Sequence, residues 1–427
     1  MHNKWDTVIL TVGSGRQKVL AEKLIDRLDI PHRIIVLSDD ESGCRIGSGG
    51  ALINAVSRCY SDGDRMLIIN SGGISKRCIN YSVKGKAFAA LIYGGREMTL
   101  LELIIEKTGA FLDRLPPGVL CCCSDIIAET DASGVDFGDN VGFCNRAGIE
   151  TGTRHGVMFP DENGKLDIYL HKVEREKLDA ASGGGDVLVD TGVTFFTGPF
   201  VLKLKETEEK YSLVRIAREN RVDINLYPEI IALLGRRIDG EEYFGRDLQN
   251  EAHAGIRRVL YENLKEFGLN VAEIKNEDFI HFGTVAESVE NIRRFAGGAE
   301  RINLNSQAEN CSFLGRAIIA GSTLKDCTLG RNVYISDIDL ESAVIPDDTL
   351  VCGIKTQGGY VAVMLPLGEN PKDISGGAEL WDIPRFYEGA SFGESFEKIL
   401  SCPGGERLSL SEIIRRADYD YPALRNK

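Results

Sequence analysis

The sequence predicts an α/β protein with a mixed, mostly parallel sheet, followed by a second part built from short stacked strands. Two observations support this fold class. In the first third of the chain, short apolar runs alternate with amphipathic stretches, which is the order of elements in βαβ units. From about Asn303 the helical periodicity disappears, and aliphatic residues recur in steps of about six residues.

Five apolar runs predict the buried strands of the sheet. Each run is short, apolar and followed by polar or glycine-containing residues. The carboxyl ends of parallel strands lie at one edge of a sheet, and ligands bind at that edge. We therefore expect the residues that follow these runs to form a site. The runs cover residues 7–12, 33–37, 66–69, 119–123 and 187–196.

Helices are predicted between these strands. Residues 51–59 form a helix that directly follows a glycine cluster. Thr99 and Glu102 have the spacing of a capping box, which predicts a helix that continues to about residue 107. A further helix follows the first strand, and its apolar stripe consists of Leu20, Leu24, Ile25 and Leu28.

The pattern beyond Asn303 is typical of a parallel β-helix, in which each short strand stacks on the next coil. We expect a Rossmann-like α/β domain over residues 1–300 and a left-handed parallel β-helix-like domain with a C-terminal cap over residues 301–427. An irregular sandwich of small strands is the alternative. The recurring positions are Leu314, Ala320, Leu324, Leu329, Val333, Ile338, Val344 and Leu350.

Charge and composition exclude several classes of function. Lys plus Arg number 50 and Asp plus Glu number 64, so the formal net charge is −14. Nucleic acids and anionic membranes bind basic surfaces, and neither is an expected partner. No apolar run reaches the roughly 18 residues of a membrane span. The 11 cysteines include no C-x-x-C pair, which favours reduced cytoplasmic thiols, and the 6 histidines form no H-x-x-x-H or Cys/His cluster, which disfavours a structural zinc site.

Two glycine clusters predict phosphate binding. The first precedes a helix, whose N-terminus offers free N–H groups and the positive end of the helix dipole. The second follows a strand and continues into Lys76 and Arg77, which supply positive charge. A tight turn is the alternative for either cluster. The predicted nucleotide-binding residues are Gly47, Ser48, Gly49, Gly50, Gly72, Gly73 and Ser75.

Neither common nucleotide-binding motif is present. A P-loop requires Ser or Thr after Gly-Lys, whereas Gly85-Lys86 is followed by Ala87. A dinucleotide fingerprint requires a third glycine, whereas the Gly-Ser-Gly cluster at residues 13–15 continues to Lys18. P-loop kinases and dehydrogenases are therefore disfavoured.

The order Gly-Gly-x-Ser-x-Arg over residues 72–77, followed by Gly85-Lys86, resembles the signature of sugar nucleotidyltransferases. It is most similar to the branch that contains L-fucose-1-phosphate guanylyltransferase (GDP-fucose pyrophosphorylase) and the pyrophosphorylase half of bifunctional fucokinase. The chain departs from this branch in having no proline in residues 78–84 and Val173 after Lys172. Further matching segments are Trp5-Asp6, Arg45 to Gly50, His155 to Val157, Leu170 to Lys172, Asp190 to Gly192, His281 to Thr284 and Leu380-Trp381.

The resemblance implies a catalytic role for three cations. Arg77 matches the family's catalytic arginine, which is expected at the leaving phosphates of a nucleoside triphosphate. Lys86 matches the signature lysine, expected at the α-phosphate or the sugar phosphate, and Lys172 is expected at the sugar phosphate. The alternative for each is a solvated surface charge, or for Lys172 a lysine at a strand edge.

The resemblance also implies that Mg²⁺ is required. Asp125 follows the strand at residues 119–123 and resembles the metal-binding aspartate of the superfamily. Asp223 is a second candidate ligand. The alternative for Asp125 is a cap on a following helix at residues 126–129.

Sugar contacts are implied for Asp190, Gly192 and His281. Asp190 and Gly192 belong to the Asp-Thr-Gly segment, and the aspartate could hold sugar hydroxyls. Mg²⁺ prefers oxygen ligands, so His281 is expected at a phosphate or hydroxyl group. A turn aspartate and a structural histidine are the alternatives.

The resemblance thus implies a cytoplasmic enzyme that joins GTP to L-fucose 1-phosphate and releases pyrophosphate, and that could form a homo-oligomer through its C-terminal part. A different sugar 1-phosphate or nucleoside triphosphate remains open, as does a non-catalytic relative that binds nucleotide sugars. Acyl transfer on the β-helix is disfavoured, because no histidine that could act as a base follows His281.

Overall fold

The computed structural model describes residues 4–40, 43–128, 132–238, 240–274, 279–389 and 407–419. The chain forms two compact units, and each is assembled from three separate segments. The first unit contains residues 1–18, 29–72 and 104–280; the second contains residues 19–28, 73–103 and 281–427. The expected single boundary near residue 300 differs from this interleaved arrangement, because residues 73–103 group with the C-terminal segment.

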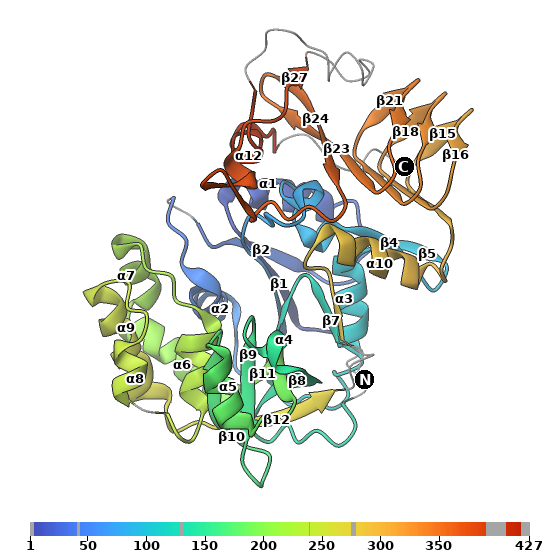
Figure 1. The fold of residues 1–427 in the computed structure, drawn as a ribbon. Helices are drawn as coiled ribbons and strands as arrows, with labels where there is room; N and C mark the ends of the chain where they lie inside the picture. The colour runs from blue at the N-terminus through green and yellow to red at the C-terminus, as the bar shows by residue number, and fades with distance from the viewer. Residues whose placement is uncertain are drawn as a thin grey trace. The chain divides into compact units, whose positions relative to one another are not determined.

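The first unit is a mixed α/β unit built on a sheet of nine strands (Figure 1). The sheet has the order β10-β9-β11-β6-β3-β1-β2, and β8 and β12 extend it beside β11. All five predicted strands are confirmed, each to within about two residues at either end. The nine strands are β1 (Thr7–Val12), β2 (Ile34–Ser38), β3 (Arg65–Ser71), β6 (Gly118–Cys123), β8 (Asn140–Ala147), β9 (Gly156–Pro160), β10 (Leu166–His171), β11 (Val187–Thr197) and β12 (Leu269–Ile274).

Strands β2, β1, β3 and β6 form a parallel block, and their register aligns their carboxyl ends. Val12 pairs with Ser38 of β2 and with Ser71 of β3, and Asn70 of β3 pairs with Cys123 of β6. Because β1 has β2 on one side and β3 on the other, the strand order reverses at β1. This reversal is the topological switch point at which α/β sheets bind ligands.

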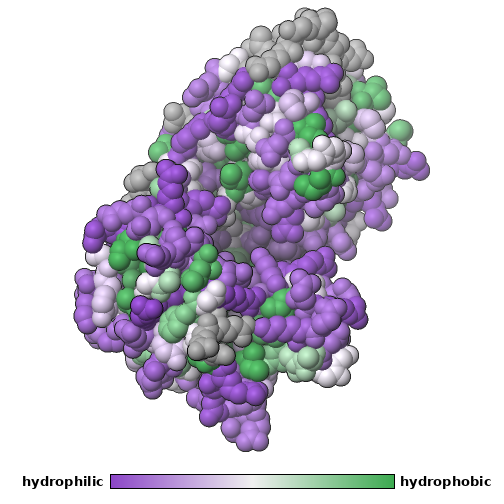
Figure 2. All heavy atoms as spheres, turned by 60° about the vertical axis from the view of Figure 1, so that its left-hand side comes forward, coloured by the Kyte–Doolittle hydropathy of each residue, from purple (hydrophilic) through white to green (hydrophobic). Residues whose placement is uncertain are grey.

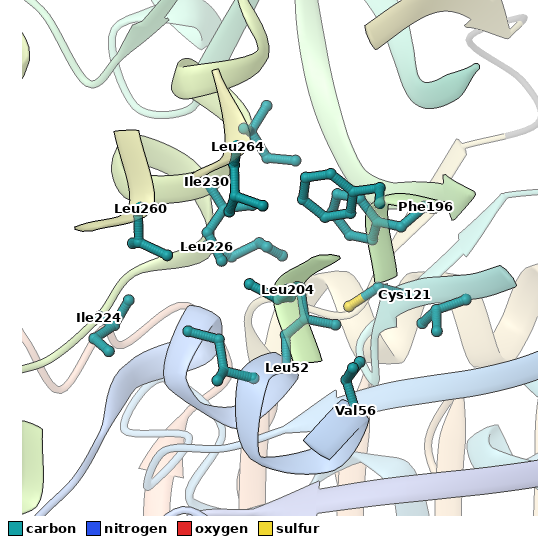
Figure 3. Close-up of a cluster of buried hydrophobic side chains, with 14 of the residues drawn as sticks. Leu52, Val56, Cys121, Phe196, Leu204, Ile224, Leu226, Ile230, Leu260 and Leu264 are labelled. Atoms are coloured by element: carbon teal, nitrogen blue, oxygen red, sulfur yellow. The ribbon is translucent and has the colours of Figure 1, made fainter. Parts of the chain in front are cut away.

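Helices of the first unit bury one face of the sheet in a continuous apolar core (Figure 3). Leu52 and Val56 of α2 pack with Leu204 of α6 and with Cys121 and Phe196 of the sheet. The helices are α2 (Gly47–Cys59), α4 (Ile149–Gly152), α5 (Arg175–Ser182), α6 (Gly198–Tyr211), α7 (Leu213–Asn220), η3 (Leu226–Ile231), η4 (Ala232–Leu234), α8 (Gly240–Gly245) and α9 (Glu251–Leu264).

Two helices cross from one unit to the other, α1 (Gly15–Ile25) and α3 (Leu100–Gly109). The predicted capping box of α3 is confirmed, since Glu102 accepts from the amide of Thr99 at 2.6 Å and Thr99 Oγ1 accepts from the amide of Glu102 at 3.3 Å. Helix α2 begins at Gly47, four residues earlier than predicted, so the glycine cluster lies within its first turn.

The second unit contains three parallel ladders of short strands in which the register advances by 16 residues. Left-handed backbone conformations repeat at the same interval at Asn310, Asp326 and Ser342, whose small polar side chains tolerate positive φ. The ladder strands are β14 (Arg301–Leu304), β15 (Gln307–Glu309), β16 (Ser312–Phe313), β17 (Ala317–Ala320), β18 (Thr323–Lys325), β19 (Thr328–Leu329), β20 (Val333–Ser336), β21 (Asp339–Glu341) and β22 (Val344–Ile345).

The first ladder continues from β20 into β23, which forms an antiparallel hairpin with β24. The hydrophobic interior of the ladders includes Ile319, Leu329 and Ile335. The other elements of this unit are η1 (Ile79–Tyr81), η2 (Lys86–Phe88), β4 (Ala90–Tyr93), β5 (Arg96–Thr99), α10 (Val285–Phe295), β23 (Thr349–Thr356), β24 (Gly359–Pro366), β25 (Ile374–Ser375), β26 (Ala378–Glu379), η6 (Leu380–Asp382), β27 (Glu388–Gly389) and α12 (Leu410–Arg416); two short strands, β7 (Ile126–Ala128) and β13 (Phe279–His281), pair outside the main sheets.

The surface drawn in Figure 2 is mainly hydrophilic, with hydrophobic residues in small, separate groups. Among the described residues, no helix is long and apolar enough to cross a membrane.

Candidate active site

The first glycine cluster brings the N-terminus of α2 into backbone contact with residues 224–226. The amides of Gly49 and Gly50 donate to the carbonyl of Ile224 at 2.8 and 3.1 Å. A Cβ at Gly47 would lie only 2.4 Å from the same oxygen, so this approach requires glycine. Ser48 Oγ accepts from the amide of Leu226 at 3.0 Å. The glycines therefore have a packing role that the sequence did not reveal. Two of the backbone N–H groups that we expected at a phosphate, those of Gly49 and Gly50, already donate to Ile224. The predicted phosphate contact stays a prediction.

The carboxyl ends of β2 and β3 meet at a buried carboxylate. Asp39 follows β2, its amide donates to the carbonyl of Val12 at 2.8 Å, and the residue is only 6% exposed. A Cβ at Gly72 would lie 2.6 Å from Oδ2 of Asp39. Burial raises the pKa of Asp39 to about 7, a shift that Arg45 opposes and Asp223 reinforces. Sequence reasoning missed Asp39, because a single aspartate after a strand is common in turns.

A cavity of about 450 Å³ lies in the first unit beside the end of β10. It brings together two predicted site residues, Lys172 and Asp223. Gln249 fixes the backbone of Asp223, donating to its carbonyl at 2.8 Å and accepting from its amide at 2.9 Å. Arg246 also lines the cavity and donates to the carbonyl of His171 at 2.8 Å, which places a second cation near Lys172.

A buried charged cluster forms part of the cavity wall. Arg257 Nη2 lies 2.6 Å from Glu229 Oε1, and His253 Nε2 lies 3.2 Å from the same oxygen. All three side chains are at most 3% exposed. Such a cluster fixes the cavity wall, because removing one partner would leave an uncompensated buried charge.

Asp190 and Gly192 lie in an internal network next to this cavity. Asp190 Oδ2 accepts from Tyr169 Oη at 2.8 Å, and Oδ1 accepts from the amide of Gly192 at 2.7 Å. Burial raises the pKa of Asp190 to about 6, although both hydrogen bonds oppose the shift. Gly192 has φ of 75°, and a Cβ there would lie 3.1 Å from Cys123 Sγ. The two oxygens that we expected at sugar hydroxyls bind within the protein here, and the predicted sugar role stays a prediction.

The candidate metal ligands come from different parts of the first unit. Asp125 lies in the turn between β6 and β7, so the alternative of a capped helix at residues 126–129 is wrong for the residues that the structure describes. Asp223 is exposed at the cavity. Within the described ranges no three His, Cys, Asp or Glu side chains group together as a metal site. Mg²⁺ is usually held by one or two carboxylates together with substrate phosphates, so aspartates of this kind fit that ion.

In the second unit, the signature lysine and the predicted histidine both lie beside Gly283. Lys86 is 8% exposed, and its Nζ donates to the carbonyl of Gly283 at 3.2 Å. His281 Nδ1 lies 3.3 Å from Glu287 Oε2. Burial raises the pKa of Glu287, but the interactions with His281 and the backbone amides of Thr284 and Gly283 together lower that pKa to about 2. A Cβ at Gly283 would lie 2.1 Å from the His281 ring and 2.8 Å from Glu287 Oε2, so a side chain at this position would displace these groups.

The other signature residues lie in the loop before Lys86. Arg77 is exposed, whereas Cys78 is buried and its Sγ lies 3.4 Å from the Gly283 carbonyl. Gly73 and Ser75 both have positive φ, of 95° and 51°. The carbonyl of Ser75 accepts from the amide of Cys78 at 2.7 Å, which closes the turn that presents Arg77.

Buried polar contacts attach this loop to the ladders. Tyr81 Oη and Tyr334 Oη lie 2.7 Å apart, and burial raises the pKa of both phenols. Lys84 Nζ lies 2.6 Å from Asp337 Oδ2, with side-chain exposures of 6% and 14%. No local sequence pattern indicates these contacts, because each pair is separated by 253 residues.

Comparison with known proteins gives one family and two curated relatives. Residues 62–412 match the family described as the fucose pyrophosphorylase domain. The chain is 24% identical to human (Homo sapiens) fucose-1-phosphate guanylyltransferase over 423 residues, covering 82% of this chain and 69% of that protein. It is also 24% identical to the mouse (Mus musculus) protein of the same name, covering 83% of this chain and 72% of that protein.

Solved structures resemble the chain more distantly. HddC from Yersinia pseudotuberculosis is 10% identical with a TM-score of 0.34, covering 68% of this chain and 78% of that one. A structure from Thermus thermophilus titled mannose-1-phosphate geranyltransferase is 12% identical with a TM-score of 0.32, covering 84% of this chain and 95% of that one. At these TM-scores the likeness supports no argument about the site.

Asp39→Asn is expected to stabilise the ligand-free protein at pH 8. The raised pKa means that the folded state holds a proton between about pH 4 and pH 7 that the unfolded state releases. The free energy of unfolding of the wild-type protein therefore falls as the pH rises from about 4 to about 7. The Asn variant cannot titrate at this position, so it lacks that decrease. Urea unfolding should show a gain of about 1 to 3 kcal/mol at pH 8 that disappears near pH 4. An equal change at both pH values would contradict the burial of this charge.

Asp337→Asn is expected to destabilise the second unit, because Lys84 would lose its buried partner. Thermal and urea unfolding should report a loss of about 3 kcal/mol. Glu341→Gln is the matched control, since Glu341 pairs with Lys325 where both side chains are about half exposed, and it should cost less than about 1 kcal/mol. Similar losses in the two variants would contradict the proposed anchoring of the loop.

Proposed function

Because the chain belongs to the fucose pyrophosphorylase domain family, we propose that it is a sugar-1-phosphate guanylyltransferase that joins GTP to L-fucose 1-phosphate. The family match carries this proposal, since it spans residues 62–412 and so includes Lys86, Lys172 and Asp190. Both curated relatives are named fucose-1-phosphate guanylyltransferase, and this name supports GTP and L-fucose 1-phosphate as the substrates.

The proposed reaction is an in-line displacement at phosphorus. An oxygen of the sugar phosphate forms a bond to the α-phosphorus of GTP, and the bond from that phosphorus to the bridging β-oxygen breaks. Pyrophosphate leaves with the electron pair. The nucleophile is already anionic at neutral pH, so the protein needs to supply position and positive charge rather than a general base.

Three cations of the chain are proposed to supply that charge. Lys86 is buried, and its ammonium is already oriented by the Gly283 carbonyl, which favours a fixed contact to the α-phosphate or the sugar phosphate. Arg77 is exposed in the same segment and would meet the leaving phosphates. Lys172 lines the cavity of the first unit and would meet the sugar phosphate.

Asp125 and Asp223 are the proposed ligands of Mg²⁺. When bound, the ion would neutralise charge on the phosphates of the triphosphate. The nucleotide would contact the glycine segments at residues 47–50 and 72–73 and Ser75. His281 would face a phosphate or hydroxyl group, while the Asp190–Gly192 turn would shape the sugar pocket.

The three parallel ladders of the second unit are proposed to form a left-handed parallel β-helix. Their 16-residue advance and the repeated left-handed corners support this interpretation. We propose further that the enzyme is cytoplasmic and that any homo-oligomer forms through this part of the chain.

Pyrophosphate release tests the proposed function directly. Purified protein with Mg²⁺ should release pyrophosphate from GTP when β-L-fucose 1-phosphate is present, and much less from ATP, UTP or CTP. Other sugar 1-phosphates serve as parallel arms. Release with a different pair would replace the proposed substrates, and no release with any pair would contradict the enzyme assignment.

Lys86→Ala is expected to reduce turnover by about 100-fold or more, because a fixed charge at the transition state is lost. Lys325→Ala removes the same charge from an exposed ion pair and should leave turnover unchanged. Steady-state kinetics and a melting curve for each variant make the comparison. Near-normal turnover in a folded Lys86→Ala variant would refute the role of this lysine.

A further inference from the structure

The carboxylate of Asp39 lies at the topological switch point of the sheet, and no donor to it occurs within the described residues. Asp39 follows β2, its amide caps the end of β1, and its side chain reaches Gly72 at the end of β3. No residue that the structure describes donates a hydrogen bond to its carboxylate, although Asp39 as a whole is only 6% exposed. The Asp39 oxygens keep some contact with solvent, so a ligand that brings hydrogen-bond donors can replace water there.

Arg45 gives the second half of this site. Its charge acts on Asp39, yet the side chain is exposed and makes no ion pair among the parts of the chain that the structure describes. Because the two side chains form no ion pair with each other in the described segments, both are available to a ligand that carries donors and acceptors. That group must present donors to Asp39 and acceptors to Arg45.

Guanine has this pattern on its edges. Its N1–H and N2–H₂ groups are adjacent, parallel donors that match the two oxygens of a carboxylate. Its O6 and N7 atoms are acceptors that arginine recognises bidentately. Adenine presents an acceptor at N1, and the pyrimidines offer no pair of adjacent donors, so these bases would leave an oxygen of Asp39 unsatisfied.

We propose that Asp39 is the residue that selects guanine, accepting from N1–H and N2–H₂, while Arg45 donates to O6 or N7. This inference rests on the proposed function and deepens it, because it assigns base selection to particular side chains. Gly72 belongs to the same site, because its missing side chain leaves the space that the Asp39 carboxylate occupies.

Two other ligands of a carboxylate fit the surroundings less well. Ribose hydroxyls are donors, but they give Arg45 no base acceptor to bind. A divalent cation would be repelled by Arg45, and no group of three metal-ligating side chains occurs in the described segments. If Asp39 bound either of these ligands, its substitution would change activity with all nucleotides alike, whereas base selection predicts a change of nucleotide preference.

The test is a change of base specificity. Asp39→Asn offers one acceptor and one donor, which matches xanthine, where N1–H lies beside the O2 acceptor. Relative to wild type, the variant should lose about 100-fold or more in kcat/KM for GTP and gain about 10-fold or more for XTP. A uniform loss for GTP, ITP, ATP and XTP without any gain for XTP would overturn the proposal in favour of a ribose, metal or structural role.

A second experiment uses the wild-type protein and therefore does not require that the variant folds. ITP lacks only the 2-amino group of GTP, and it should react about 10- to 100-fold less efficiently because one Asp39 oxygen loses its donor. Equal kcat/KM for ITP and GTP would overturn the proposal. Arg45→Ala should lower kcat/KM for GTP and should remove the preference for GTP over nucleotides whose base lacks O6. An unchanged preference would overturn the role of Arg45.

Controls separate this inference from the proposed function. Asp62→Asn makes the same charge change at an exposed residue before β3, at the opposite edge of the sheet, and should leave base preference unaltered. Nucleotide affinity is also measured by calorimetry without a sugar phosphate. If the wild-type protein binds GTP more tightly than XTP, and Asp39→Asn binds XTP more tightly than GTP, base selection is supported even where no sugar phosphate supports turnover. If Asp39→Asn turns over GTP with an unchanged base preference, the proposed guanylyltransferase activity is retained and the inference about Asp39 is refuted.

Discussion

Close approach of backbone segments, permitted only by glycine, determines the geometry of the ligand edge. At Gly47 and Gly49 the first turn of α2 receives the carbonyl of Ile224, and any Cβ at Gly47 would collide with it. The segment held in this way carries Asp223 to the cavity. Gly72 acts similarly for Asp39. Steric exclusion therefore fixes where both carboxylates lie, and the apolar core behind α2 supplies the free energy that keeps the segments together.

Local sequence patterns were sufficient for the sheet because its central strands are buried on both faces. Such strands appear as continuous apolar runs, so their positions could be predicted without knowledge of their partners. The capping box at Thr99 was equally local. The ladders were harder to predict, since aliphatic residues recur at every strand and reveal only the distance between strands. Asn310, Asp326 and Ser342 show the full 16-residue interval, because a left-handed backbone position recurs with each advance of the ladder register.

The candidate site was predictable only in part, because its contacts join residues far apart in the sequence. Lys86 could be identified by its resemblance to a signature, but its contact with Gly283 could not. Asp190 shows the opposite difficulty: its motif suggested a ligand contact, whereas Tyr169 and Gly192 occupy its oxygens. Asp39 carries no motif at all. Only burial distinguishes it from an ordinary turn aspartate, and burial depends on the packing of several segments.

The charge distribution explains how an acidic chain could bind a polyanion and still discriminate among bases. With a net charge of −14, the long-range field of the chain would repel a nucleoside triphosphate, so binding must depend on local cations such as Lys86, Lys172 and Arg246. Contacts from such cations to phosphate would not depend on the base. Discrimination requires a group whose desolvation is compensated by one base and left uncompensated by the others. A buried carboxylate such as Asp39 meets this requirement because its destabilising effect on the free protein is relieved only by the correct pattern of donors. The same burial that lowers the stability of the free protein thereby becomes the source of selectivity.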